Sequence, residues 1–252
     1  MTPLALITGG QRGIGLGIAR ALAEQGFAIA LASECAPNDP DVVAALSELG
    51  GAARFYRHDL RQIEACAGLL DAVEAQQGPV TSFISNAGVA PLKRVDLLDT
   101  QAESFDFVMA INLRGGFFLA QEVARRMVRA PSDDPRSMVF ITSVSAEMVT
   151  TDRSDYCMSK AAGSMMAQLF AARLAADGVS VFEVRPGIIQ TAMTAAVREK
   201  YDARIADGLI PARRWGFADD VGRMVVPLVT GQMAYATGSV LAVDGGLSIP
   251  RL

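Results

Sequence analysis

Short apolar runs alternate with longer runs of helical periodicity along the whole chain. Most of the apolar runs have strand length and carry too few polar residues for one face to meet water, which is typical of parallel strands covered on both sides. We predict strands at 4–8, 28–33, 53–58, 80–85, 138–143, 179–184 and 239–244. The patterns between them predict helices at about 14–25, 40–49, 62–77, 101–130, 155–177 and 219–230.

This alternation predicts an α/β fold built from βαβ units, with a doubly wound parallel sheet and helices on both faces. No internal repeat, low-complexity tract or change in composition interrupts it, so we expect residues 1–252 to form one domain. Two segments, 89–104 and 190–216, fall outside the rhythm, and each follows the predicted carboxyl end of a strand, where open α/β sheets bind ligands. An ordinary surface loop explains 89–104 equally well, whereas the length of 190–216 favours a substrate lid.

Charge and composition narrow the class of protein. The net charge is −4 without a long run of one sign, which gives no indication of nucleic-acid binding. The apolar runs are far shorter than the roughly 20 residues of a membrane-spanning helix, and no secretion signal precedes the first strand. Cys35, Cys66 and Cys157 form no CxxC pair and fit reduced thiols, and His58 is the only histidine. We therefore expect a cytoplasmic protein without a metal site.

A glycine cluster joins the first predicted strand to the first predicted helix. Gly9, Gly10, Gly13 and Gly15 follow the strand directly, and glycine lets backbone N–H groups approach an anion closely. The start of the next helix adds unpaired N–H donors and a positive dipole end. Alone, the cluster is equally well a tight turn, but its place between strand and helix favours a pyrophosphate site.

Tyr156 and Lys160 stand four residues apart on a predicted helix, so their side chains share one face. An ammonium group beside a phenol stabilises the phenolate, and such a pair can exchange a proton with a substrate. Alone, a pair with this spacing is more often an incidental surface contact. Two further residues change that balance. Ser143 ends the strand 138–143, and Asn112 interrupts the helical run 101–130 among poor helix formers, where it could also be a locally satisfied polar group that bends the helix.

Together with "NAG" at 86–88 and "RPG" at 185–187, these motifs resemble the short-chain dehydrogenase/reductase family in order and spacing over most of the chain. The resemblance implies an NAD(P)-dependent Rossmann fold with strand order 3-2-1-4-5-6-7. It also implies catalysis by Asn112, Ser143, Tyr156 and Lys160. Ser143 would polarise a substrate carbonyl, Tyr156 would transfer the proton, and Lys160 with a water held by Asn112 would reload it.

The resemblance also implies which residues hold the cofactor. Asp59 and Leu60 would hold the adenine, although Asp59 alone would be interpreted as a helix N-cap, and Asn86 and Gly88 alone as a strand-ending turn. The full implied set is Gly9, Gln11, Arg12, Gly13, Ile14, Gly15, Ser33, Glu34, Asp59, Leu60, Asn86, Ala87, Gly88, Tyr156, Lys160, Pro186, Gly187, Ile189 and Thr191.

The end of the second strand bears on the choice between NAD and NADP. Ser33 stands where NAD enzymes of this kind carry an aspartate, so no carboxylate at that position would repel a 2′-phosphate, and Arg12 could bind one. Glu34 acts in the opposite direction because it could bind ribose hydroxyls. The pattern slightly favours NADP.

The substrate and the partners are less well defined. Within the family, the pattern is most similar to 3-oxoacyl-acyl-carrier-protein reductases and to sugar or polyol dehydrogenases. Five basic residues in the segment 190–216 could form a docking patch for an acidic carrier protein: Arg198, Lys200, Arg204, Arg213 and Arg214. The same side chains could equally form an ordinary solvent-exposed helix face. A catalytically silent NAD(P)-binding protein is less favoured because the catalytic residues are intact. The helix 155–177 is small and apolar nearly all round, which predicts burial against another subunit, in a homotetramer as the family usually forms.

Overall fold

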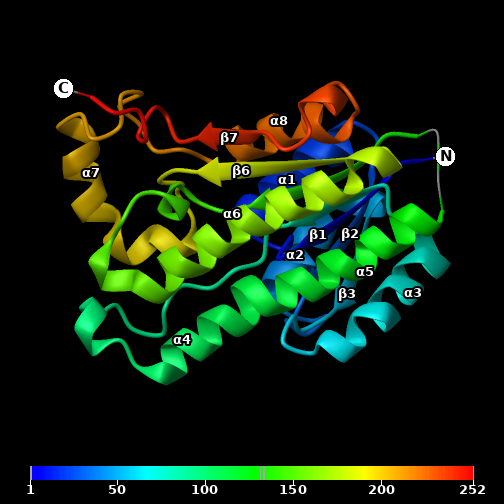
Figure 1. Ribbon diagram of the computed structural model, residues 1–252, viewed down its shortest axis with the longest axis horizontal. Coiled ribbons are helices and arrows are strands. Elements are labelled where there is room, and N and C mark those ends of the chain that lie inside the picture. Colours follow the sequence, from blue (N-terminus) through cyan, green and yellow to red (C-terminus); the bar gives the residue numbers. More distant parts are fainter. Residues whose placement is uncertain (1, 131, 133, 252) are drawn as a thin grey trace.

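The protein is described by a computed structural model covering residues 2–130, 132 and 134–251. Seven parallel strands form one sheet in the order β3-β2-β1-β4-β5-β6-β7 (Figure 1). This confirms the predicted fold class and strand order. The strands are β1 (Leu4–Thr8), β2 (Ala28–Ser33), β3 (Ala53–Arg57), β4 (Ser82–Ser85), β5 (Arg136–Ile141), β6 (Val179–Pro186) and β7 (Val240–Val243).

Helices cover both faces of the sheet, as the apolar character of its strands requires. One face is covered by α1 (Gly13–Glu24), α2 (Pro40–Leu49) and α8 (Ala218–Val229). The other is covered by α3 (Cys66–Gln77), α5 (Gly116–Arg129) and α6 (Ser154–Leu174), with α4 (Ala102–Met109) packed beside α6 (Figure 1). Each face has its own core: Phe83 and Phe140 lie in one, Ile7 and Phe182 in the other. The last strand, β7, is less covered, and Val240 is 43% exposed.

The direction in which successive strands are added to the sheet reverses between β1 and β4. From β1 the chain proceeds to β2 and β3 on one side, then returns to place β4 on the other side of β1. The connections leaving the carboxyl ends of β1 and β4 therefore diverge and leave a crevice between them. This crevice lies beside the glycine turn and is where the site begins.

The helical run predicted at 101–130 is divided by a π-helical turn, η4 (Ala110–Gly115). Asn112 lies in this wide turn, and its amide binds the backbone of Val89: Nδ2 donates to the carbonyl (3.0 Å), and Oδ1 accepts from the N–H (2.8 Å). Gly115 ends the turn against Leu60, whose carbonyl oxygen would lie 2.2 Å from a Cβ at position 115. The helix is thus interrupted where Asn112 binds Val89 and where Gly115 permits close packing.

The predicted lid segment, 190–216, is largely ordered into a 3₁₀ turn, η8 (Ala192–Val197), and helix α7 (Arg198–Ala206). Ile205 and Ile210, both within this segment, are buried. The Trp215 indole Nε1 donates to Asp202 Oδ1 at 2.6 Å, and the Trp215 ring packs edge-on against Tyr201. These contacts hold the segment together, a β-bridge between Ile189 and Gly216 closes its base, and α7 stands beyond the carboxyl edge of the sheet (Figure 1).

None of the helices in the described part of the chain is long and apolar enough to cross a membrane. Within the same residues, no three His, Cys, Asp or Glu side chains are grouped so that they could hold a metal ion.

Candidate active site

A cavity of about 600 Å³ follows the carboxyl edge of the sheet from the glycine turn to the N-terminal part of α6. Most of the residues predicted to bind the cofactor line it. These are Gly9, Gln11, Arg12, Gly13, Ile14, Ser33, Glu34, Asp59, Leu60, Asn86, Ala87, Gly88, Tyr156, Lys160 and Thr191.

The glycine turn at one end of the cavity is built for close backbone packing. Gly13 begins α1 with a φ of +54°, a conformation that side-chain-bearing residues rarely adopt. A Cβ on Gly15 would lie 2.3 Å from the carbonyl oxygen of Gly9, so Gly15 supports the turn from below and does not line the cavity. The N-cap residue of α1, Arg12, makes no side-chain cap, and the first N–H groups of the helix remain available to an anion.

Thr8 fixes this turn to β4, a role that the motif alone did not reveal. Its Oγ1 accepts hydrogen bonds from the N–H groups of Asn86 and Ala87, both at 3.0 Å. Asn86 Nδ2 donates in return to the carbonyl of Thr8 at 2.9 Å. The ends of β1 and β4 are held together here, and "NAG" at 86–88 forms the floor of the crevice.

In the part of the cavity beside the end of β3, Asp59 is held by Arg61. The Arg61 Nη2 donates to Asp59 Oδ2 at 2.6 Å, and this hydrogen bond, with the Arg61 charge, lowers the pKa of the Asp59 carboxyl. Burial lowers the pKa of the neighbouring His58, and the charge of Asp59 opposes that effect in part. His58 and Arg61 both line the cavity, although the sequence-based set included neither.

The end of β2 carries the residues that bear on the 2′ position of a dinucleotide. Ser33 is buried, and its Oγ accepts from the N–H of Cys35 at 3.4 Å. Arg12 is paired with Asp41 at 3.2 Å on the surface. Arg57, the register partner of Ser33 on β3, donates from Nε to the Glu34 carbonyl at 3.2 Å. Of these residues, Ser33, Glu34 and Arg12 line the cavity, so one carboxylate and one guanidinium compete at this part of its wall.

Tyr156 and Lys160 lie together at the chemical end of the cavity. The Lys160 Nζ is 5.6 Å from the centre of the Tyr156 ring and donates to the carbonyl of Ile141 at 3.1 Å. Lys160 is buried apart from its access to the cavity, with 9% of its surface exposed. The helix spacing thus places both groups in one environment.

Neither Ser143 nor Asn112 lines the cavity, but Asn112 is close to Lys160, because a Cβ on Gly88 would lie 3.3 Å from Asn112 Oδ1 and 3.5 Å from Lys160 Nζ. Ser143 lies two residues beyond the end of β5 and caps a 3₁₀ turn, η5 (Val144–Ala146), by accepting from the N–H of Ser145 at 3.0 Å. Its own hydroxyl hydrogen has no acceptor among the described residues and is free to donate. The Asn112 Nδ2 also donates to Ser159 Oγ at 3.1 Å, so both of its amide hydrogens are used.

Three other predicted residues lie away from the cavity wall. Pro186 ends β6, and Gly187 packs against Asp244, where a Cβ would lie 2.7 Å from the Asp244 backbone. Ile189 is buried in the core on the α1 side. Sequence reasoning missed several lining residues, chiefly the apolar ones: Thr8, Ala32, Val89, Ala90, Phe107, Ile111, Ile141, Thr142, Ala192 and Met193.

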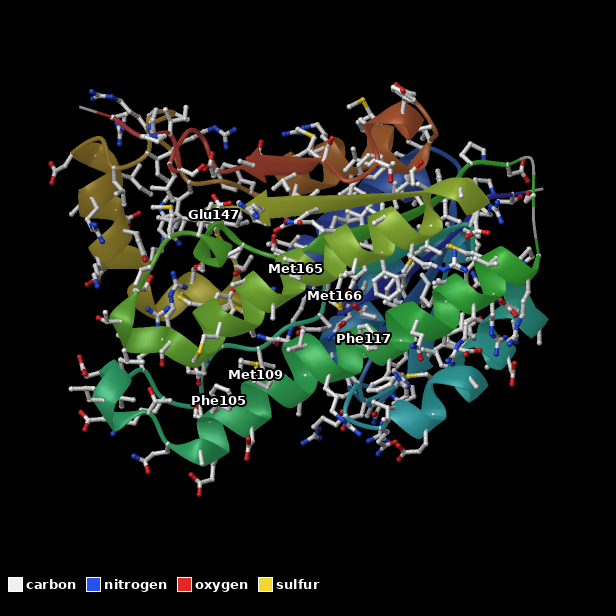
Figure 2. All side chains as sticks on the ribbon, viewed as in Figure 1. Phe105, Met109, Phe117, Glu147, Met165 and Met166 are labelled. Atoms are coloured by element: carbon white, nitrogen blue, oxygen red, sulfur yellow. The ribbon has the colours of Figure 1, made fainter. Side chains whose placement is uncertain are left out.

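A buried ion pair between Glu183 and Arg185 is hydrogen-bonded to Thr142 in the cavity wall near Tyr156 and Lys160. Glu183 on β6 is 2% exposed, and its Oε1 accepts from Thr142 Oγ1 (2.5 Å) and from Arg185 Nε (2.7 Å). Its Oε2 accepts from Ser164 Oγ at 2.7 Å. Arg185 also pairs with Glu147, which lies at the tip of β6 in Figure 2. The network thus joins β5, α6, β6 and the turn after Ser143.

The cavity fits a dinucleotide cofactor. It connects a helix N-terminus suited to a pyrophosphate with a lysine and a tyrosine suited to proton transfer. Gln11 is buried in its wall, and Gln11 Oε1 has no hydrogen-bond partner among the described residues, which leaves an acceptor for a ligand.

Comparison with known proteins agrees with this fit. The family model described as "Enoyl-(Acyl carrier protein) reductase" matches residues 9–248. The chain belongs to the short-chain dehydrogenase/reductase family and is an NAD(P)-dependent oxidoreductase that interconverts a ketone and a secondary alcohol by hydride transfer.

Three relatives indicate the range of its neighbours. The chain is 35% identical to 3-oxoacyl-[acyl-carrier-protein] reductase MabA of Mycobacterium bovis over 97% of this chain and 92% of the relative. It is 31% identical to 2-dehydro-3-deoxy-D-gluconate 5-dehydrogenase of Pseudoalteromonas atlantica, over 96% and 94%. A crystal structure of 3-oxoacyl-[acyl-carrier protein] reductase from Brucella melitensis in complex with NAD has a TM-score of 0.95 and 45% identity, covering 100% of this chain and 99% of that one.

Proposed function

We propose that the protein reduces the ketone of a 3-oxoacyl thioester to the corresponding alcohol. The observation that carries the proposal is the continuous cavity from the glycine turn to Tyr156 and Lys160. Exposed apolar side chains on the segments that follow β4, β5 and β6 suit an acyl chain: Leu92, Met148, Val149 and Met193.

In this proposal each catalytic residue has a separate task. When bound, the nicotinamide supplies or accepts the hydride. Ser143 donates its free hydroxyl hydrogen to the substrate carbonyl oxygen, where negative charge develops. Tyr156 gives its proton to the same oxygen, and Lys160 stabilises the phenolate that remains. Asn112 Oδ1 accepts one bond from Val89 and keeps a second lone pair for a water that returns the proton.

A sugar or polyol dehydrogenase is the second candidate, and Glu147 favours it. Its side chain is 72% exposed four residues after Ser143, and Arg185 holds its carboxylate in place. Such a carboxylate accepts hydrogen bonds from substrate hydroxyls. Steady-state kinetics with a short-chain 3-oxoacyl thioester and with a panel of keto-sugars separate the two. Negligible turnover of every thioester would end the first proposal.

We propose NADP(H) as the preferred cofactor by a small margin, because Ser33 brings no carboxylate to the cavity wall and Arg12 lines the same cavity. The opposing charge of Glu34 keeps the margin small. The ratio of kcat/KM for NADPH and NADH measures the preference, and a ratio below one would contradict it.

Tyr156→Phe in the same assay should abolish nearly all turnover while leaving cofactor affinity unchanged.

We propose that residues 1–252 act as one cytoplasmic domain and that the segment 190–216 is its substrate lid.

We also propose that an acyl carrier protein docks beside this lid. Arg198, Lys200 and Arg204 lie exposed on α7. Arg214 is less available because it forms two bonds to Asp220, at 2.7 and 3.0 Å. Reversing the three α7 charges to glutamate should raise KM for a carrier-bound substrate and leave KM for the free thioester unchanged. An equal change for both would contradict docking.

We propose a homotetramer in which a second copy covers the outer face of α4 and α6. One face of α6 is buried against the sheet, and the opposite face exposes Met158, Met165 and Leu169 by 44%, 54% and 60%. Phe105 on α4 lies on the same side of the molecule as Met165 (Figure 2). A neighbouring copy would bury this patch, and the poorly covered β7 could support a second interface. Met165→Glu should reduce the mass measured by light scattering, and a monomeric wild type would contradict the proposal.

A further inference from the structure

The N-terminus of α6 carries a cation where a helix favours an anion. Arg153 is the N-cap residue of α6, and its side chain makes no capping hydrogen bond. Serine, threonine, aspartate and asparagine are preferred at this position, and the helix dipole disfavours a positive charge there. Local departures of this kind are expected where a residue serves function.

The Arg153 guanidinium lies on the ring of Tyr156. Its Cζ is 5.4 Å from the ring centre, slightly nearer than the Lys160 Nζ at 5.6 Å. Its Nη2 donates to Thr150 Oγ1 at 3.3 Å, whereas its Nε is buried and has no hydrogen-bond partner in the described part of the chain. The phenol ring is therefore in contact with two cations.

No carboxylate among residues 2–130, 132 and 134–251 forms an ion pair with Arg153. The adjacent Asp152 pairs with Arg94 at 3.6 Å instead. Asp155 is buried and accepts from Ser104 Oγ at 2.7 Å and from the N–H of Tyr156 at 2.8 Å. The charge of Arg153 is thus not neutralised by its neighbours along the chain.

The elements packed against this end of α6 carry other charged groups, none of which, among the described residues, lies over the Tyr156 ring. On the side of β6 and η5, Glu183 and Glu147 are both bound to Arg185. On α4, Glu103 and Asp106 are exposed, and on η4, Arg114 lies against Phe118. Among the described residues, Arg153 and Lys160 are the charged groups that lie over the Tyr156 ring.

We propose that Arg153 is a positioning residue for proton transfer, and that it stabilises the phenolate of Tyr156 together with Lys160 and holds the ring in place. The inference rests on the proposed function in that it assigns the proton transfer to Tyr156. It adds to that function a second cation, placed three residues before the tyrosine. Arg153→Met removes the charge and keeps most of the apolar stem.

The test is the pH dependence of kcat/KM for alcohol oxidation, in which the phenolate acts as the base. In Arg153→Met the midpoint of the rising limb should move to higher pH by about 0.5 to 1 unit, and the rate at pH 7 should fall about 3- to 10-fold. Arg153→Lys should recover at least half of the shift. Arg173→Met is the matched control, because Arg173 lies exposed on the same helix and pairs with Asp177, and it should cause no shift.

A spectroscopic titration makes the outcome independent of the substrate. The ultraviolet absorbance of tyrosinate is recorded for wild type, for Arg153→Met and for the Tyr156→Phe form of each, and the difference isolates Tyr156. The same upward shift is expected.

Absence of turnover on every carbonyl would defeat the proposed function but leave this titration readable. An unchanged midpoint overturns the inference, and so does a loss confined to anionic substrates, which would assign Arg153 to substrate binding. Arg153→Gln repeats the measurement if the methionine variant unfolds.

Discussion

Arg185→Met should destabilise the protein strongly, because it leaves the Glu183 carboxylate buried without its cation. The Glu183 side chain is 1% exposed, and that of Arg185 is 12% exposed. Arg185 supplies two of the four hydrogen bonds to this carboxylate, from Nε at 2.7 Å and from Nη2 at 3.3 Å. The Thr142 and Ser164 hydroxyls supply the others and remain in the variant.

Removing one partner of a buried ion pair costs about 3 to 5 kcal/mol, and the two remaining hydroxyl donors place the expected loss near 3 kcal/mol. Glu183→Gln in the same chain removes the stranded charge while its amide oxygen still accepts from Thr142. The double variant should therefore be more stable than Arg185→Met alone, with a loss of about 1 to 2 kcal/mol. The two effects should be strongly non-additive.

Urea unfolding at one fixed protein concentration and at pH 7 measures these differences, since an oligomer's stability depends on concentration. Glu147→Ala is the control. It removes the outer partner of Arg185, whose side chain is 72% exposed, and should cost less than about 1 kcal/mol. The reasoning is refuted if Arg185→Met lies within 1 kcal/mol of wild type, or if the double variant is as unstable as the sum of the single ones.

Two further predictions concern the cofactor end. Gly15→Ala places a Cβ 2.3 Å from the Gly9 carbonyl oxygen and should weaken NAD(P)H binding at least about 10-fold in a fluorescence titration. Gly68→Ala on α3 is the control, because a Cβ there would have nothing within 4 Å, and it should leave the affinity unchanged. Equal affinities of the two variants would contradict the close packing at Gly15. His58 has a pKa lowered by burial, so the unfolded chain takes up its proton first as the pH falls below 6.5. The free energy of unfolding should then decrease below that pH, and His58→Gln should reduce the slope; an unchanged slope would exclude His58 as its source.

The sheet and the glycine turn could be predicted because their causes are local. A strand such as β1 is buried on both faces and reads as an apolar run, and glycine at position 13 is required by the positive φ there. The pairing of Tyr156 with Lys160 follows from helix geometry once the helix is known.

The remainder depends on contacts between distant segments. The π-helical turn arises from Asn112 binding Val89, 23 positions away, and from Gly115 packing on Leu60. His58 and Arg61 line the cavity because β3 ends beside β2, which no short motif encodes. The buried network did leave a signal: Glu183 and Arg185 interrupt the apolar pattern of β6 two positions apart, so both point to the same face.

The wide turn of η4 restricts where residues can be inserted or deleted in this part of the chain. A π-helical turn holds one residue more than an α-helical turn, so deleting one residue from Ala110–Gly115 would convert the wide turn into a regular α-helical turn. Helices α4 and α5 would then form one continuous helix, and Asn112 would lose the wide turn that lets its amide bind the backbone of Val89. Natural variation in length should therefore accumulate in the loop before α4 and be absent from this turn.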